Sequence, residues 1–132
     1  ELFARSDIVS LHTAMTPETT HIADRDRLAS MRAGAALINT GRGPLVDEAA
    51  LIDEVGAGRL NAGLDVFSVE PLGPEHPFLS MENVVLLPHV GSATASTRLA
   101  MVNRALENLH AGMVGQALPY CANPEVYPIS ES

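Results

Sequence analysis

Four short, mostly apolar runs stand out along the chain. Polar residues do not alternate regularly with apolar ones in them, which is typical of strands buried on both faces of a parallel sheet. Helical patterns lie between the runs. The sequence therefore predicts alternating strands and helices, with right-handed crossovers placing helices on both faces of the sheet. The expected strands are residues 8–11, 35–38, 62–64 and 84–87.

Helix starts are marked by residues that cap a first turn. Thr16 precedes Pro17, and Asp24 and Asp47 each precede a helical pattern, so we expect helices to begin at these three places. The helices after Asp24 and Asp47 should end near residues 32 and 56. The longest predicted helix covers residues 94–114, where apolar side chains recur at steps of three and four: Leu99, Val102, Leu106, Leu109 and Met113.

Two segments lack a regular pattern. Residues 68–80 contain three prolines and predict an irregular loop, and the tail after Leu118 is also proline-rich and should be extended. The whole pattern indicates half of an open doubly wound α/β sheet. In such sheets, ligands bind beyond the carboxyl ends of the strands. Candidate chemistry is therefore expected directly after each strand.

Composition narrows the possible partners. The chain has 132 residues, enough for one domain at most, and 46% of them are hydrophobic. All eight basic residues are arginine, against 16 acidic ones, and the net charge is −8. This acidic balance argues against nucleic acid and anionic membrane surfaces as partners. No apolar run reaches the ~20 residues of a membrane helix, and we expect no signal peptide in residues 1–5. The single cysteine, Cys121, fits a cytoplasmic setting.

An arginine between two glycines follows the second predicted strand, in Asn39-Thr40-Gly41-Arg42-Gly43. Glycine permits positive φ angles and a close approach of a ligand to the backbone. A guanidinium at this place could hold a carboxylate through two parallel hydrogen bonds. The sequence pattern alone favours this binding role and a simple turn with a solvated arginine equally.

Three titratable residues follow the next two strands. Asp65 comes at the end of the third strand, where it could act on a ligand or simply order the following loop. Glu70, taken alone, is most simply a solvated carboxylate. His89 lies beside a glycine after the fourth strand, and histidine suits proton transfer near neutral pH. His12, at the end of the first strand, is a weaker candidate.

Several kinds of site are absent from the sequence. No glycine-rich phosphate loop occurs anywhere in the chain, because neither Gly41-x-Gly43 nor Gly56-x-Gly58 has the required third glycine. No pair of histidines has the spacing of zinc ligands. No serine lies in a nucleophile elbow.

Taken together and in order, the motifs resemble the D-isomer-specific 2-hydroxyacid dehydrogenases, and within them the glyoxylate and hydroxypyruvate reductase branch. The likeness covers nearly the whole chain. It implies the C-terminal half of a Rossmann-like doubly wound parallel sheet, with a long C-terminal helix and an extended tail. The motifs that carry it are Ser6-Asp7-Ile8-Val9-Ser10-Leu11-His12, Ile38-Asn39-Thr40-Gly41-Arg42-Gly43, Gly63-Leu64-Asp65-Val66-Phe67 with Glu70-Pro71, and Pro88-His89-Val90-Gly91-Ser92.

The resemblance implies a role for each catalytic candidate. Arg42 matches the arginine that binds the carboxylate and carbonyl oxygen of a small 2-oxo or 2-hydroxy acid. His89 matches the general acid that protonates the developing alkoxide during hydride transfer from NAD(P)H. Glu70 matches the carboxylate that hydrogen-bonds this histidine and keeps it protonated. Both cationic groups would stabilise negative charge on the reacting oxygen.

The resemblance also implies contacts with NAD(H) or NADP(H). Asp65 matches the residue at the nicotinamide amide, and Ala14 stands in a loop where the family often has proline. The expected cofactor-binding residues are Ala14, Thr20, Thr40, Gly41, Arg42, Asp65, His89 and Gly91. We expect no metal ligands.

The resemblance divides the chain into residues 1–117, the second half of an NAD(P)-binding domain, and residues 118–132, a return segment towards a substrate domain. The residues that would bind the pyrophosphate are not in this sequence, so we expect the 132 residues alone to bind cofactor weakly and to be inactive. The full-length protein should be a homodimer. The alternative hypothesis is a catalytically silent binding or corepressor-like module built on the same half-fold.

Overall fold

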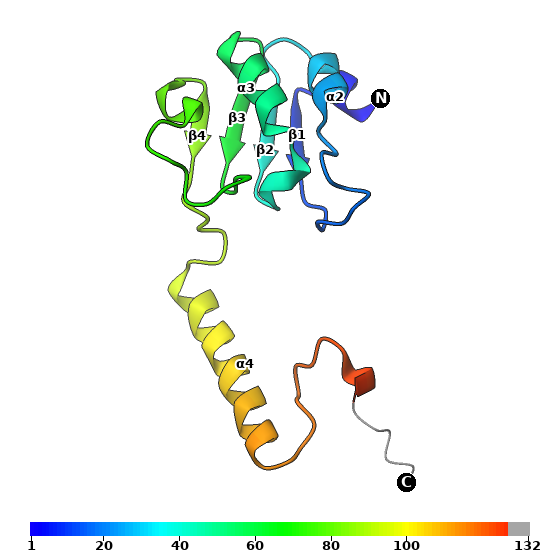
Figure 1. Cartoon of the computed structure of the whole chain (residues 1–132), viewed down its shortest axis with the longest axis vertical. Coiled ribbons are helices and arrows are strands. Elements are labelled where there is room, and N and C mark those ends of the chain that lie inside the picture. Colours follow the sequence, from blue (N-terminus) through cyan, green and yellow to red (C-terminus); the bar gives the residue numbers. More distant parts are fainter. Residues whose placement is uncertain (127–132) are drawn as a thin grey trace. The chain divides into compact units, whose positions relative to one another are not determined.

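Figure 1 shows the computed structural model of the chain, which describes residues 1–126. These residues form two compact units, residues 1–91 and the residues from 92 onward. The first unit contains the elements α1 (Leu2–Arg5), β1 (Ile8–Leu11), α2 (Arg25–Ser30), β2 (Ala36–Asn39), η1 (Gly43–Leu45), α3 (Glu48–Gly56), β3 (Asn61–Leu64), η2 (Pro77–Ser80) and β4 (Val84–Leu86).

The four predicted strands are confirmed, each within about one residue of its expected bounds, and they form one sheet in the order β1-β2-β3-β4. All neighbouring pairs are parallel: Ala36 of β2 pairs with Ile8 on one side and with Asn61 on the other. β3 and β4 continue the same pattern. Because all strands run in one direction, the segments that follow them begin at the same edge of the sheet (Figure 1). The expectation of an α/β parallel sheet is therefore confirmed.

Within residues 1–91, helices cover one face of the sheet, which corrects the expectation of helices on both faces for this unit. α2 and α3 contact each other and lie over the same face (Figure 1). The order of the strands explains this, because right-handed crossovers between strands added successively in one direction all pass over the same face. Helices on both faces would require the strand order to reverse.

Burial along the strands shows the same asymmetry. Side chains alternate between buried and more exposed positions in β1, β2 and β3. Val9 and Leu37 point into the core beside Leu28 of α2 and Leu51 of α3. On the opposite face Ile8 is 67% exposed and Val85 is 66% exposed. The expectation of strands buried on both faces is therefore wrong for residues 1–91 considered by themselves.

Two of the three helix starts predicted in this unit, at Asp24 and Asp47, are confirmed. The Asp24 carboxylate accepts a hydrogen bond from the Arg27 N–H (2.8 Å), and the Asp47 carboxylate accepts one from the Ala50 N–H (3.0 Å). α2 ends at Ser30, slightly before the expected residue 32.

The helix expected after Thr16 is wrong, because the segment forms only hydrogen-bonded turns. The N–H groups of Thr19 and Thr20 both bond the Thr16 carbonyl. The Thr19 hydroxyl also donates to the Ala14 carbonyl at 2.8 Å. Threonine side chains that bond nearby backbone groups compete with helix formation, which accounts for the difference.

The second unit is built on α4 (Ala95–Met113), which confirms the long helix expected over residues 94–114. Thr94 caps its first turn by accepting from the Thr97 N–H at 3.2 Å. The tail turns back along the helix, since the Asn108 side chain exchanges two hydrogen bonds with the backbone of Tyr120. After that the described tail contains one short turn, η3 (Pro124–Val126). Residues 127–132 of the expected return segment lie outside the described residues. Among residues 1–126, no helix is both long and apolar enough to cross a membrane.

We predict that Leu37→Ala lowers the free energy of unfolding by about 2–5 kcal/mol, because it opens a cavity between the sheet and the two helices. Leu37 is fully buried at the centre of the core. Denaturant-induced unfolding followed by circular dichroism measures the change. Val69→Ala is the control, since Val69 is 74% exposed and its loss should change stability by less than about 0.5 kcal/mol. Equal effects of the two substitutions would contradict this description of the core.

Candidate functional site

Three turns or loops at the carboxyl edge of the sheet contain the main candidate residues. The turn after β2 carries Arg42, the loop after β3 carries Asp65 and Glu70, and the turn after β4 carries His89. Each lacks regular secondary structure where the candidate residue occurs. A buried or partly buried polar side chain holds each of them in place.

Asn39 fixes the turn that presents Arg42. Its side chain is 1% exposed and lies at the end of β2. The Asn39 amide nitrogen donates to the Arg42 carbonyl (2.9 Å), and its oxygen accepts from the Gly41 N–H (3.1 Å). The Arg42 guanidinium donates to the Gly41 carbonyl at 2.7 Å and is otherwise exposed. The turn is therefore held from inside while the guanidinium is accessible to a ligand.

Gly43 allows two parts of the site to approach each other. A Cβ atom there would overlap the carbonyl group of Phe67, in the loop after β3. Neither Gly41 nor Gly43 has a positive φ angle. The glycines after Asn39 therefore do not serve an unusual backbone conformation, and at Gly43 the close approach is to the chain's own backbone.

Asp65 joins the end of β3 to the turn after β4. Its carboxylate is buried, with 3% of the residue exposed. One oxygen accepts from the Val90 N–H (2.8 Å) and the other from the Gly91 N–H (2.9 Å). His89, directly before these two amides, has a φ angle of 54°, a left-handed conformation that is unfavourable for a residue with a Cβ. Asp65 thus holds the backbone that presents His89, while its predicted contact with nicotinamide stays a prediction.

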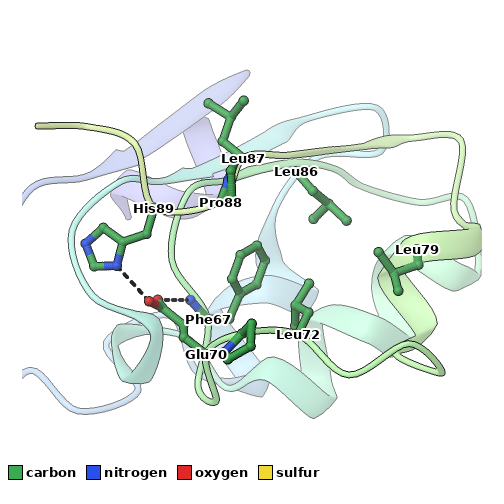
Figure 2. Close-up of a pocket in the computed structure, with 9 residues that line it drawn as sticks. Phe67, Glu70, Leu72, Leu79, Leu86, Leu87, Pro88 and His89 are labelled. Carbon is green, nitrogen blue, oxygen red and sulfur yellow. Dashed lines mark hydrogen bonds and ion pairs between the residues drawn. The ribbon is translucent and has the colours of Figure 1, made fainter. Parts of the chain in front are cut away.

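Glu70 and His89 form a hydrogen-bonded pair (Figure 2). The His89 Nδ1 lies 2.7 Å from one carboxylate oxygen of Glu70, and the other oxygen accepts from the Phe67 N–H at 2.9 Å. A carboxylate can only accept, so Nδ1 carries the hydrogen in this bond. The Nε2 atom is then left for another partner. The hydrogen bonds from His89 and from the Phe67 amide lower the pKa of Glu70 below its ordinary value.

An apolar pocket of about 530 Å³ adjoins the Glu70–His89 pair. Figure 2 shows the His89 imidazole directed away from the apolar side chains of this pocket, with Glu70 at its edge. The pocket therefore lies behind the pair, on the side opposite the Nε2 atom. Its apolar lining is formed by Phe67, Pro71, Leu72, Leu79, Leu86, Leu87 and Pro88.

The other predicted residues occupy the same edge without joining the pair. Thr40 is exposed in the turn after β2. Ala14 and Thr20 lie in the turns after β1, where the Thr20 hydroxyl donates to the Thr16 carbonyl at 3.0 Å. His12 lies 2.8 Å from the Ser10 hydroxyl. Within residues 1–126, no hydrogen bond or ion pair links these residues or Arg42 to Glu70 or His89, and no group of residues could hold a metal ion.

Sequence reasoning did not single out two residues that shape the site, Asn39 and Glu48. Asn39 offered a usable signal, since it is a polar residue at the end of an apolar strand and directly before a glycine turn. Glu48 offered little, because an acidic residue in the first turn of a helix is ordinary there. Its contacts with the loop after β3 join residues 20 and 28 positions apart and appear only in the fold.

Comparison with known proteins identifies relatives of the chain. Residues 1–91 match the family model described as "D-isomer specific 2-hydroxyacid dehydrogenase, NAD binding domain". A glyoxylate/hydroxypyruvate reductase B of Serratia proteamaculans is 48% identical over 126 residues, which is 95% of this chain and 39% of that protein. The chain thus spans about two fifths of the length of the curated relatives it matches.

Two solved structures share both fold and sequence with the chain. The TT0316 protein from Thermus thermophilus matches with a TM-score of 0.85 and 48% identity, over 89% of this chain and 38% of that one. An NADPH-dependent glyoxylate/hydroxypyruvate reductase from Sinorhizobium meliloti, solved with NADP and malonate, matches with a TM-score of 0.78 and 41% identity, over 85% of this chain and 35% of that one.

The lowered pKa of Glu70 predicts a pH-dependent contribution to stability. A carboxyl group whose pKa is lower when folded stabilises the fold above its ordinary pKa, and this contribution disappears as the pH falls through the lowered value. The wild type should therefore be more stable than Glu70→Gln at neutral pH, and the difference should shrink progressively below the ordinary pKa of 4.5. Urea unfolding at several pH values measures it.

The matched control is Glu75→Gln, because Glu75 is an exposed carboxylate of the same loop. Its stability difference from the wild type should stay constant over the same pH range. A difference for Glu70→Gln that grows in acid would have the wrong sign for a lowered pKa.

Proposed function

Because the chain belongs to the family of D-isomer specific 2-hydroxyacid dehydrogenases, we propose that it is the nicotinamide-proximal half of the cofactor domain of an NAD(P)-dependent reductase. The complete enzyme would transfer hydride between NAD(H) or NADP(H) and a small 2-oxo or D-2-hydroxy acid such as glyoxylate or hydroxypyruvate. The observation that carries the proposal is the 2.7 Å bond between Glu70 and His89, at the sheet edge that also presents an accessible Arg42.

The residues at this edge fit a nicotinamide cofactor. Gly91, two residues after His89, is exposed. The turn after β2 exposes the Thr40 side chain and the Arg42 guanidinium. Such donors suit the ribose hydroxyls and the amide of a nicotinamide nucleoside. Thr40, Gly41, Arg42, Asp65, His89 and Gly91 would line the nicotinamide side, with Ala14 and Thr20 towards the adenosine. The bound cofactor would supply the hydride that the substrate's carbonyl carbon accepts.

Arg42 and His89 would act on the oxygen atoms of the substrate. The planar Arg42 guanidinium can hold the substrate carboxylate and carbonyl oxygen through parallel hydrogen bonds. The Arg42 backbone is fixed by Asn39, and the guanidinium donates to the Gly41 carbonyl. His89 would donate the proton on Nε2 to the carbonyl oxygen as negative charge develops there. Two cationic donors aimed at one oxygen stabilise the transition state more than the ground state.

Glu70 would orient the His89 imidazole through its carboxylate. Its bond to Nδ1 leaves Nε2 as the atom that faces the substrate. Because the Phe67 N–H donates to the second oxygen of Glu70, both carboxylate oxygens are held by hydrogen bonds. The apolar pocket adjoins the pair on the side of Glu70. In the reverse direction the same pair would remove the proton from a 2-hydroxy acid.

The proposal extends to the organisation of the whole protein. Residues 1–117 would belong to the cofactor domain and residues 118–132 would lead to a substrate domain. The single cysteine, Cys121, is free, which fits the reducing cytoplasm. We further propose that the full-length protein is a homodimer. It would bind small 2-oxo or 2-hydroxy acids and neither nucleic acid nor membranes.

The full-length protein that carries this sequence should oxidise NADH or NADPH in the presence of glyoxylate or hydroxypyruvate. The loss of nicotinamide absorbance measures the reaction, with each coenzyme tested against each acid. The 132-residue chain assayed alone is the control and should be inactive. A folded, cofactor-binding parent protein that is inactive with these and other small 2-oxo acids would contradict the proposal and support a silent binding or corepressor-like module.

Substitutions of His89 and Arg42 should have different kinetic effects in the full-length enzyme. His89→Ala removes the general acid and should lower kcat by ~10²–10⁴-fold, with little change in the Kd of the cofactor. Arg42→Ala removes a contact made in both the ground state and the transition state, so it should raise KM and lower kcat together. Steady-state kinetics and fluorescence titration with NADH measure these values. An unchanged kcat in either variant would contradict the role assigned to that residue.

A further inference from the structure

The loop that carries Glu70 has little regular structure to hold it. Between the end of β3 and the start of β4 it contains only the short η2 turn. The Glu70 carboxylate is fixed by one bond to the Phe67 N–H and one to His89. The position of Glu70 therefore depends on how well the backbone near residues 67–70 is held. A displacement there would move the carboxylate relative to His89 Nδ1.

Glu48 holds this loop from outside. It is the first residue of α3, and one of its carboxylate oxygens accepts a hydrogen bond from the Ser68 N–H at 3.1 Å. Ser68 directly follows Phe67, whose own N–H binds Glu70. Adjacent amides thus bind two different carboxylates, Phe67 that of Glu70 and Ser68 that of Glu48. These two hydrogen bonds fix the orientation of the backbone at Phe67 and Ser68, just before Glu70.

The second Glu48 oxygen contacts the far end of the same loop. It lies 3.4 Å from Nε2 of His76, and both side chains are largely shielded, at 24% and 18% exposed. The His76 Nδ1 accepts from the Phe78 N–H at 3.4 Å. Since a nitrogen that accepts carries no hydrogen, Nε2 is the protonated atom and donates to Glu48. His76 also packs against the ring of Phe78, which is 1% exposed.

Glu48 also connects this loop to the turn that carries Arg42. That turn leads into α3, and Gly43 within it lies against the Phe67 backbone. One side chain therefore spans the loop on both sides of Glu70, from the helix that begins just after Arg42. Glu48 contacts neither Glu70 nor His89 directly, and the sequence motifs assign it no role.

We propose that Glu48 is a positioning residue for the Glu70–His89 pair, which it aligns by clamping the Glu70 loop at Ser68 and His76. This inference rests on the proposed function of the pair. Glu48 takes no part in proton transfer. It affects the reaction only by determining the position of the Glu70 carboxylate. Small misplacements of reacting groups are costly, since about 1 Å can reduce a rate by about 10²-fold.

Glu48→Ala in the full-length enzyme should lower kcat by about 10- to 100-fold, with little change in KM or in the cofactor Kd. Glu48→Gln should recover most of the activity, since its amide oxygen can still accept from the Ser68 N–H. The matched control is Asp26→Ala, which removes an exposed acidic residue from the first turn of α2 and should leave activity unchanged.

A double-mutant cycle with Glu70→Gln separates positioning from general damage. If Glu48 acts through Glu70, then Glu48→Ala should lower kcat far less when Glu70 is already replaced. The same cycle measured by urea unfolding at neutral pH should also be non-additive, and this reading needs no enzymatic activity. Additive effects in both cycles, or a fall in kcat that Glu48→Gln does not recover, would overturn the inference.

The two proposals fail in distinguishable ways. An inactive wild type with non-additive unfolding would refute the proposed function while leaving the clamp in place. An active wild type with additive effects would refute the positioning role alone.

Discussion

The buried Asp65 carboxylate is the interaction on which the rest of the site depends. It receives two backbone N–H groups from a turn 25 and 26 residues further along the chain, and it is almost fully removed from solvent. A buried carboxylate left without these donors would be strongly unfavourable, so the turn and the strand end stabilise each other. The turn places His89 within hydrogen-bonding distance of Glu70 in the neighbouring loop. Without this link, the Glu70–His89 bond would remain between the segments that follow β3 and β4, but the His89 backbone would lose the hydrogen bonds that fix the turn.

The three catalytic candidates all stand outside regular secondary structure, and each is held by a polar group on a neighbouring segment. Asn39 closes the Arg42 turn, Asp65 holds the His89 turn, and Glu48 reaches the Glu70 loop. Parallel strands bring these segments to one edge, but their backbone ladders end before the functional side chains begin. Hydrogen bonds to buried or partly buried side chains then supply the rigidity that a helix or strand would otherwise give. The site thus combines accessible side chains with supporting residues that are less exposed.

The sequence predicted those features that depend on local signals. The strands and the caps at Asp24 and Asp47 follow from short apolar runs and from residues adjacent to the helices. The helix predicted after Thr16 is wrong, because bonds from threonine side chains to the backbone favour turns over a helix in this segment. Coverage of one face could not be foreseen, since Ile8 is as apolar as Val9 although only Val9 is covered. The pairing of Glu70 with His89 was predicted only by the family resemblance. The two residues are nineteen positions apart, and no pattern of spacing predicts a contact over that distance in the sequence.

The backbone at His89 has a consequence for how this site can change. Its φ angle of 54° is one that glycine adopts freely and that histidine adopts only under constraint. The residue best suited to the local backbone therefore lacks the imidazole that the proposed chemistry needs. A laboratory selection for heat resistance alone would favour glycine at this position, and the resulting variants would be more stable but would lack the proposed general acid. Screens on the full-length protein must therefore measure turnover together with melting temperature, because the two criteria favour different residues at this position.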